Sequence, residues 1–368
     1  MTTPKRRLPV MADVAKEAGV SHQTVSRVLN DHPNVRADTR ARVEAAITRL
    51  GYRRNLVARA LVTKRSRTLG VVSFDTTLYG PASTVYGIEQ AARTAGYFVS
   101  IVSLKSIDAD SVRDAIDYLT EQGVDGVVVV APQRSAARAL ESLPAGMPAV
   151  AVEGTYHRPG VSVVCIDQAV GARLATRHLL ELGHETVWHV AGPSDWMETE
   201  GRIEGWRAAL EEAGRPVPEP LAGDWSPRAG YEAGRSLAAM EGVTAVFAAN
   251  DQMALGVLRA LSEAGVRVPE QISVVGFDDI PESEFFSPPL TTVRQDFDAV
   301  GRHCIEVLLR QIDSGRGGYQ RLVVPPGFVV RSSSAPARDP ARDSARDSAR
   351  VSARVPAPAP FPGRPAGR

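Results

Sequence analysis

Between residues 69 and 277, short apolar runs alternate with longer stretches of helical periodicity. The apolar runs form two sets of four, at 69–74, 98–104, 126–130 and 149–152, and at 161–166, 186–191, 245–248 and 272–277. The helical stretches lie at 84–95, 109–121, 134–143, 170–182, 203–213, 229–239 and 252–264. Continuous Val- and Ile-rich strands between helices predict parallel sheets covered on both faces. The two sets therefore predict an α/β body of two Rossmann-like lobes, with a ligand beyond the carboxyl ends of the strands.

The net charge of +1 conceals an uneven distribution along the 368 residues. Residues 1–68 contain 15 Lys or Arg and 5 Asp or Glu, a net charge of +10. Residues 69–330 contain 20 basic and 34 acidic side chains, a net charge of −14, and residues 331–368 contain 8 Arg and 3 Asp. A small basic module on an acidic body indicates a polyanionic partner for the front end. A solvated basic arm without a partner would carry the same charge.

The basic front end has the periodicity of three short helices. In 11–20 apolar residues recur at i, i+3, i+4 and i+7, and Gly19 stands where a left-handed C-cap is expected. Ser21 can cap a second helix, and a third is predicted for 39–50 with Gly51 as its stop. Two helices joined by a tight turn form a helix-turn-helix, whose second helix enters the major groove of DNA.

The side chains on the outer face of the second helix suit base recognition. Arg27 can donate two parallel hydrogen bonds to O6 and N7 of guanine, and Gln23 can pair with adenine. Ser21, Thr24 and Asn30 are short polar side chains that can hold phosphates and fix the register. A three-helix protein-binding module with a polar face would also fit the pattern, but the charge of the front end favours DNA.

Several motifs resemble the LacI/GalR family of bacterial transcription regulators. In the front end the motif is DVAKEAGVSHQTVSRVLND at 13–31, followed by Thr39-Arg40, Val43 and Leu50-Gly51-Tyr52. In the body the motifs are GDWS at 223–226, ANDQMALG at 249–256, ISVVGFDD at 272–279 and PPLTTVRQDF at 288–297. The resemblance covers about residues 8–331.

This resemblance implies a domain organisation and a fold. A small all-α helix-turn-helix DNA-binding head is expected at 1–54, a hinge helix and linker at 55–68, and a two-lobed effector-binding and dimerisation body at 69–331. The family's body has the α/β type I periplasmic-binding-protein fold, in which the chain crosses three times between the lobes. We place these crossings near Asp167, Gln295 and Pro325. A disordered Ala/Arg/Pro-rich tail is expected at 332–368.

The resemblance also assigns DNA contacts to the hinge. In the family, paired hinge helices enter the minor groove, and a leucine matching Leu61 wedges between base pairs and kinks the duplex. A free helix at 55–64 would be marginal in water, so we expect it to fold on DNA, with a plain connector as the alternative. Arg54 replaces the family's usual proline, which predicts a less rigid entry into the hinge. The expected DNA-contacting residues are Ser21, His22, Gln23, Thr24, Ser26, Arg27, Asn30, Thr39, Tyr52, Asn55, Ala58 and Leu61.

Polar side chains at the ends of the expected strands suggest a sugar site. Glu153, Asn250 and Asp278 carry carboxylate and amide groups that can discriminate among sugar hydroxyls. An aromatic ring such as Trp225 or Phe297 can cover the apolar face of a pyranose. The residues that match effector-contacting positions of the family, or replace them, are Leu78, Pro81, Glu153, Glu198, Arg202, Trp225, Asn250, Asp278, Gln295 and Phe297.

Four pocket positions leave the identity of the sugar open. Compared with the family pattern that this sequence resembles, Glu153 replaces an aspartate, Glu198 a serine and Thr84 an isoleucine. Trp196 adds a bulky ring to the loop that contains Glu198. Two added carboxylates and a large ring can change which sugar fits.

Other candidate sites are weaker. His178, His184 and His189 lack the further ligands of a tetrahedral metal site, so no metal and no cofactor is expected. Asp251 and Asp279 fit capping or structural roles as well as ligand contacts.

The composition indicates a cytoplasmic protein. The chain has no run of about 18 apolar residues, no apolar segment behind its basic start, and only two cysteines. The tail repeats Ala-Arg with period four and lacks a leucine-rich heptad helix, so we expect a homodimer held by the body. Alternatively, the tail arginines add nonspecific DNA affinity.

Three function classes follow. The first is a repressor that binds a near-palindromic operator as a dimer and is released by a small sugar effector. The second, an extracytoplasmic sugar receptor, fits the body but not the basic head. The third, a sugar-modifying enzyme, lacks an arranged nucleophile or phosphate loop, so we expect no enzyme activity.

Overall fold

The computed structural model describes residues 9–53, 65–74, 77–104, 109–130, 132–134, 140, 143–144, 146–153, 161–315 and 318–337. The chain divides into two units, Met1–Ser66 (the head) and Arg67–Arg368 (the body), each described by itself below. Outside the described residues lie the expected hinge contacts Asn55, Ala58 and Leu61, most of the helix expected at 134–143, and the tail from 338 onward. Within the described ranges, no helix is long and apolar enough to cross a membrane.

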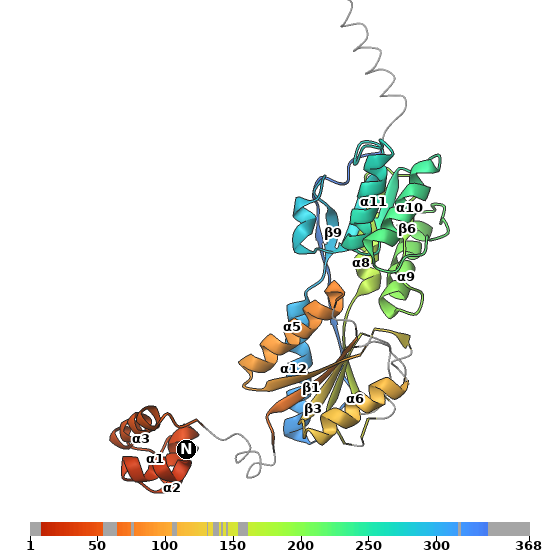
Figure 1. Ribbon diagram of the computed structural model, residues 1–368. Coiled ribbons are helices and arrows are strands. Elements are labelled where there is room, and N and C mark those ends of the chain that lie inside the picture. Colours follow the sequence, from red (N-terminus) through yellow and green to blue (C-terminus); the bar gives the residue numbers. More distant parts are fainter. Residues whose placement is uncertain are drawn as a thin grey trace, which may run out of the picture. The chain divides into compact units, whose positions relative to one another are not determined.

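The described part of the head contains three helices, labelled α1, α2 and α3 in Figure 1, and a small apolar core between them. The helices are α1 (Met11–Ala18), α2 (His22–Leu29) and α3 (Ala37–Leu50). Val14, Val25 and Val43, one from each helix, are buried against one another in this core. Gly19 and Gly51 end α1 and α3 in the left-handed conformation, at φ 64° and 63°, as expected from their positions. The third helix starts two residues earlier than the expected 39.

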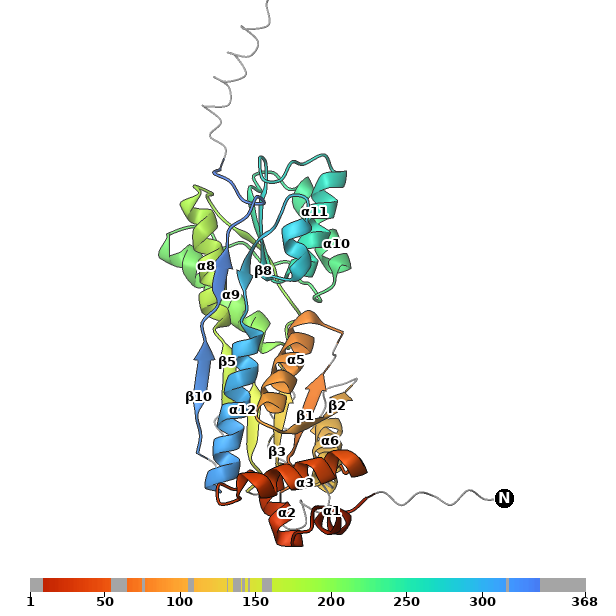
Figure 2. The ribbon, with the colours of Figure 1, turned by 90° about the vertical axis from the view of Figure 1, so that its left-hand side faces the viewer.

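The first lobe of the body (the N-lobe) contains a six-stranded parallel sheet in the order β10-β5-β4-β3-β1-β2. The strands are β1 (Thr68–Phe74), β2 (Phe98–Leu104), β3 (Gly126–Val130), β4 (Ala149–Val152), β5 (Val161–Ile166) and β10 (Arg321–Val324). Helices α5 (Tyr79–Thr94) and α12 (Phe297–Ser314) cover one face, and α6 (Ala109–Glu121) covers the other (Figure 2).

The second lobe (the C-lobe) contains a five-stranded sheet in the order β11-β9-β8-β7-β6. Its strands are β6 (Trp188–Val190), β7 (Ala245–Ala248), β8 (Ser273–Asp278), β9 (Thr291–Arg294) and β11 (Gly327–Val329), of which only β11 runs antiparallel to its neighbour. Helices α8 (Gln168–Glu181) and α9 (Met197–Glu212) cover one face, and α10 (Pro227–Ala239) and α11 (Asp251–Glu263) the other. A 3-10 helix, η1 (Pro281–Phe285), lies between β8 and β9.

The chain crosses between the lobes three times, at the expected places. It leaves β5 for α8 at Asp167, leaves β9 for α12 at residues 295–296, and leaves β10 for β11 at residues 325–326. Asp167 and Asp296 cap the helices that follow the first two crossings, because their carboxylates accept hydrogen bonds from Val170 N (3.0 Å) and Ala299 N (2.8 Å). The expected α/β architecture of two lobes is therefore confirmed.

Two expectations about chain segments need correction. The run 186–191 forms strand only at Trp188–Val190, and the body contains β9, α12, β10 and β11 in addition to the expected elements. Residues 332–337, which we expected in the disordered tail, pack on the C-lobe. Ser333 is fully buried, accepts a hydrogen bond from Thr291 N (2.8 Å) and donates to Val274 O (2.6 Å), so this segment belongs to the body.

Candidate functional site

The second helix of the head presents a polar face on a fixed base. The Ser21 hydroxyl accepts a hydrogen bond from Thr24 N (3.1 Å), which caps α2 as the sequence predicted. Val25 and Val28 anchor the inner side of α2 in the core of the head. His22, Gln23 and Arg27 lie exposed on the opposite side, where a polar surface for DNA was expected.

The other expected DNA-contacting residues of the head occupy different settings. Ser26 and Thr24 are half-buried on α2, Asn30 is exposed at its C-cap, and Thr39 is half-buried on α3. Tyr52 is only 8% exposed and packs in the core of the head. Its ring therefore serves the core, and only the small exposed part of the residue is available to DNA.

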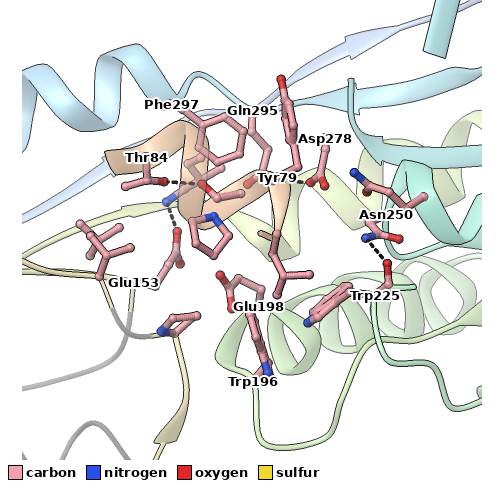
Figure 3. Close-up of a pocket in the computed structure, with 18 of the residues that line it drawn as sticks. Tyr79, Thr84, Glu153, Trp196, Glu198, Trp225, Asn250, Asp278, Gln295 and Phe297 are labelled. Carbon is pink, nitrogen blue, oxygen red and sulfur yellow. Dashed lines mark hydrogen bonds between the residues drawn. The ribbon is translucent and has the colours of Figure 1, made fainter. Parts of the chain in front are cut away.

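The body has a cavity of about 270 Å³ between its lobes, and all ten expected effector-contacting residues line it (Figure 3). From the N-lobe come residues at the start of α5, after β4 and at the start of α12, and from the C-lobe residues on α9 and at the ends of β7 and β8. The lining also includes Tyr79, Thr84, Trp196, Ser226 and Gln252. Of these, sequence reasoning singled out Thr84 and Trp196 but missed Tyr79, whose only signal was an aromatic residue just after the first strand.

Arg202 is the centre of the polar network in the cavity. It is 4% exposed, its Nε donates to Gln168 Oε1 (2.9 Å), and Nη1 donates to the carbonyl of Ala249. Its Nη2 lies 3.8 Å from Asp278 Oδ1, and its guanidinium carbon lies 3.9 Å from the centre of the Phe277 ring. Two donors of Arg202 thus go to protein acceptors, and its guanidinium forms an ion pair with Asp278.

A chain of amides continues this network. Gln295 Nε2 donates to Asp278 Oδ1 (2.6 Å), and Gln168 Nε2 donates to Gln295 Oε1 (3.1 Å). Burial raises the pKa of Asp278 to about 6, an effect that the charge of Arg202 opposes. Because Gln168 and Gln295 lie at two of the crossings between the lobes, the network joins the cavity to two of the segments that connect the lobes.

Asn250 and Trp225 form a second fixed corner. Asn250 Oδ1 caps α11 by accepting from Met253 N (2.8 Å), and its Nδ2 donates to Trp225 O (3.1 Å). Trp225 has a left-handed backbone at φ 72° and is 6% exposed. Gly192 is required beside it, since a Cβ at that position would lie 2.2 Å from the indole ring.

Aromatic rings form the apolar wall of the cavity. The rings of Trp196 and Trp225 meet edge to face at 5.4 Å, and those of Tyr79 and Phe297 at 5.9 Å. Apolar walls with a few placed polar groups are the usual construction of small-molecule sites.

Two further carboxylates reach the cavity from opposite lobes. Glu153 follows β4, has a left-handed backbone at φ 64°, and its Oε1 accepts from Ile166 N (3.0 Å). Burial raises the pKa of Glu153 to about 7. Burial and then the charge of Glu153 raise the pKa of Glu198, on α9, well above its usual value.

Direct contacts also close one side of the cleft. Met197 N donates to Pro132 O (3.0 Å) and Arg134 N to Asp195 O (3.1 Å), so the segment after β3 pairs with the segment before α9. The Arg134 guanidinium lies 2.7 Å from the Glu200 carboxylate. The lobes are therefore joined beside Trp196 and Glu198.

Asp251 and Asp279 have structural partners. Asp251 accepts hydrogen bonds from Ile280 N (2.9 Å) and from the hydroxyls of Ser283 and Thr292 (2.6 Å each). Asp279 pairs with Arg294 (2.5 Å) and Arg331 (2.7 Å). Neither lines the cavity, and the helix cap beside Asp251 is Asn250.

His178, His184 and His189 each contact protein groups of their own. Within the described ranges, no group of three His, Cys, Asp or Glu residues could hold a metal ion. His178 bonds Ser334, and His184 bonds Thr244 and Ser273. His189 is fully buried, stacks on Phe247, and has a pKa lowered to about 4 by burial.

Comparisons with known proteins match both units. Residues 10–55 match the model of bacterial regulatory proteins of the lacI family, and residues 176–334 match a periplasmic binding protein-like domain. The lactose operon repressor of Escherichia coli (strain K12) is 35% identical over 328 residues, which cover 88% of this chain and 89% of that protein.

Solved structures agree with these matches. The Lac repressor dimer bound to operator and the anti-inducer ONPF is 33% identical, with a TM-score of 0.78 over 89% of this chain and all of that one. The complex of the transcriptional regulator CelR with cellobiose is 34% identical, with a TM-score of 0.67 over 88% of this chain and 99% of that one.

Proposed function

Because the chain belongs to the LacI family of bacterial regulatory proteins, we propose that it is a sequence-specific transcriptional repressor. It binds a near-palindromic operator as a dimer and is released by a small sugar that binds between the lobes. The observation that carries this proposal is that one chain combines a capped helix with an exposed polar face and an interlobe cavity lined by all ten expected residues.

On the DNA side, the exposed face of α2 reads the major groove. Arg27 and Gln23 lie four residues apart, on one side of the helix, and can reach neighbouring base edges. Short polar residues on and around α2 hold phosphates, and the residues at 55–61 contact the minor groove. We assign residues 1–54 to DNA binding, 55–68 to the hinge and linker, and the body to effector binding and dimerisation.

A dimer is required because two half-sites need two recognition helices. The body supplies exposed apolar side chains for such contacts. Phe285 at the end of η1 is 80% exposed and Leu255 on α11 is 41% exposed. Asp251, at the start of α11, accepts hydrogen bonds from Ile280 N and from the Ser283 hydroxyl on η1. Phe285 and Leu255 therefore lie on neighbouring elements. We assign this surface to the contact between protomers.

The sugar acts through both lobes. Pro81 and Phe297 contact it from the N-lobe, and Trp225, Asn250 and Asp278 from the C-lobe. Only a ligand with different affinities for two lobe arrangements can shift the equilibrium between them. Sugar binding therefore favours the arrangement in which the hinge segments of a dimer separate and the operator is released.

The cavity binds without catalysing a reaction. Its buried polar groups are held by one another, as Arg202 and Gln295 hold Asp278, and its Ser226 hydroxyl caps α10. The proposed action on operator DNA places the protein in the bacterial cytoplasm.

The test is fluorescence anisotropy of the full chain on DNA from upstream of its own gene, repeated with a panel of sugars at fixed salt. Competitor-resistant binding that one sugar releases is the expected result. If the protein binds no fragment of that DNA specifically, the proposal that it is a repressor is wrong. If it binds DNA but no sugar alters the binding, only the proposal of a sugar effector is wrong.

Asp278→Asn is the matched variant for the cavity. We expect it to bind operator as the wild type does and to lose release by the sugar, because the carboxylate that accepts a sugar hydroxyl is gone. If Asp278→Asn destroyed operator binding in a folded protein, the proposed division of labour between head and body would be wrong.

A further inference from the structure

Among the described residues that line the interlobe cavity, acidic side chains outnumber basic ones. Glu153, Glu198 and Asp278 are acidic, and Arg202 is the single basic residue of this described lining. The donors of Arg202 go to Gln168, to the carbonyl of Ala249 and toward Asp278. No ion pair among the described residues includes Glu153 or Glu198, so within that part of the chain neither carboxylate has a cationic side chain of its own within 4 Å.

The two glutamates face the cavity from opposite lobes. Glu153 extends from the end of β4 in the N-lobe, and Glu198 from the first turn of α9 in the C-lobe (Figure 3). Glu198 Oε2 is shielded from solvent and has no hydrogen-bond partner among the described residues. A buried acceptor without a partner costs about 1–3 kcal/mol, so this oxygen favours a ligand that donates to it.

Like charges on the two lobes oppose closure of the cleft. The charge of Glu153 acts on Glu198 and raises its pKa, in the same direction as burial. With no ligand, protonation of one of the two carboxyl groups relieves this repulsion. A cation between the two carboxylates removes the repulsion directly and leaves both ionised.

The aromatic wall also suits a cation. The edge-to-face pair of Trp196 and Trp225 lines the same cavity as Glu198, and Tyr79 and Phe297 line it from the N-lobe. Aromatic faces attract ammonium groups, most strongly where water is excluded. Carboxylates and aromatic rings together form a site for an organic cation.

We propose that the effector is a hexosamine, a saccharide with a free primary ammonium group, and that Glu153 of one lobe and Glu198 of the other hold this ammonium between them. The inference rests on the proposed function, because it takes the cavity to be the effector site. Asn250, Asp278 and Gln295 supply hydrogen bonds for the sugar hydroxyls. The ammonium ties the two lobes together, which gives the effector its differential affinity for the closed cleft.

The test is isothermal titration calorimetry of the full chain at pH 7 and fixed salt with matched sugar pairs. The pairs are glucosamine and glucose, galactosamine and galactose, and the β-1,4-linked glucosamine disaccharide and cellobiose. We expect at least one amine to bind ten-fold or more tightly than its hydroxyl parent. Glu153→Gln and Glu198→Gln should each reduce this preference to about two-fold or less.

The matched control is Glu204→Gln, which neutralises an exposed glutamate on the same helix as Glu198 and should keep the full preference. Thermal melting verifies that each variant is folded. Equal binding of amine and parent, an amine preference that survives both glutamate substitutions, or no binding of any amine would each overturn the inference.

Operator binding by anisotropy separates this inference from the proposed function. If the protein binds operator specifically but shows no preference for amines, the hexosamine proposal is wrong and the repressor function stands. If an amine binds in the cavity but the protein has no affinity for operator, the repressor function is wrong and the assignment of the ligand stands.

Discussion

The recognition helix of the head and the cavity of the body use polar side chains in opposite ways. On α2, Gln23 and Arg27 are exposed, and the backbone of the helix is fixed by a cap and an apolar inner face. In the cavity, Arg202, Asp278 and Gln295 are 4%, 7% and 9% exposed. Gln295 donates a hydrogen bond to Asp278, and the guanidinium of Arg202 forms an ion pair with Asp278 at 3.8 Å. Groups that meet base edges can remain hydrated until DNA arrives, whereas groups around a buried ligand need protein partners beforehand.

This difference predicts where substitutions act. In the network of Arg202, Asp278 and Gln295 a polar substitution should reduce the stability of the body, because each of these groups pairs with another buried group. On α2 the same kind of substitution should leave stability unchanged and alter the choice of base pair. The four predictions below test this separation.

The largest effect is expected from Arg202→Met. Removal of the guanidinium leaves Asp278 without its opposite charge in a buried site, which should lower the free energy of unfolding of the body by about 3–5 kcal/mol. Urea unfolding followed by tryptophan fluorescence measures this directly, because all four tryptophans lie in the body. Arg207→Met, at an exposed position of the same helix, is the control and should change little.

A loss below about 1 kcal/mol in Arg202→Met, or an equal loss in Arg207→Met, would contradict the structural role of the network. Operator binding at temperatures where the body stays folded should match that of the wild type. A parallel loss there would mean that the cavity and the recognition helix are not separable.

The pH dependence of the body tests a second buried group. Burial raises the pKa of Asp251 to about 7, so between about pH 4 and pH 7 the native state holds a proton that the unfolded chain has released. The contribution of this group to the free energy of unfolding therefore falls as pH rises through that window, by at most about 1.4 kcal/mol per unit. Asp251→Asn cannot ionise and should flatten the dependence measured by urea unfolding at pH 5, 6 and 7.

Glu270→Gln, at an exposed position, is the control and should keep the slope of the wild type. An unchanged slope in Asp251→Asn would show that Asp251 is ionised throughout, held by its three hydrogen-bond donors.

Most strands that the sequence predicted without any shift are buried along their whole length, and the partly exposed β2 is the exception. The runs 98–104, 126–130, 149–152, 161–166 and 245–248 form β2, β3, β4, β5 and β7 without any shift, and β3, β4, β5 and β7 are buried along their whole length. By contrast β10 and β11 have three or four residues and are partly exposed, and they exist because they pair with strands far away in the sequence. Local periodicity carries no signal for such pairing.

The sequence predicted which residues line the cavity, but it did not predict the hydrogen bonds among them. Family resemblance selected ten residues, and all of them line the cavity. The chain of hydrogen bonds from Arg202 through Gln168 and Gln295 to Asp278 depends on two crossings that meet only in the folded body. The left-handed backbone of Glu153 and Trp225, which aims both side chains, likewise follows from tertiary packing.

On the head, Arg27→Gln should change specificity without changing stability. The proposed bidentate contact of Arg27 with guanine would be lost, which costs about 1–3 kcal/mol at one base pair and little at the others. Anisotropy against operators substituted at each position measures this loss. Arg42→Gln, an exposed arginine on α3, is the control and should leave the pattern of base preference unchanged. A uniform loss at every position in Arg27→Gln would reassign Arg27 to phosphate binding.

The smallest effect is expected from the caps, and it compares the two units on the same chemistry. Ser21 caps α2 through Thr24 N (3.1 Å), and Ser226 caps α10 through Ala229 N (3.2 Å). Substitution by alanine removes about 1 kcal/mol in each case. The helix α2 has 8 residues in a small head, whereas α10 has 13 and packs along α11 over the apolar cluster of the C-lobe.

Hydrogen exchange of the full chain, followed by mass spectrometry, should therefore respond differently to the two caps. Ser21→Ala should speed exchange throughout α2 about five-fold, because the loss is a large share of the stability of a small unit. Ser226→Ala should speed exchange only in the first turn of α10, since the rest of that helix is held by packing on α11. Spread of the Ser226→Ala effect along the whole of α10 would show that this helix opens as one unit, as expected for α2. Confinement of the Ser21→Ala effect to the first turn of α2 would show that the head is as firmly held as the body. Either result would contradict the contrast between a small DNA-binding head and a cooperative ligand-binding body.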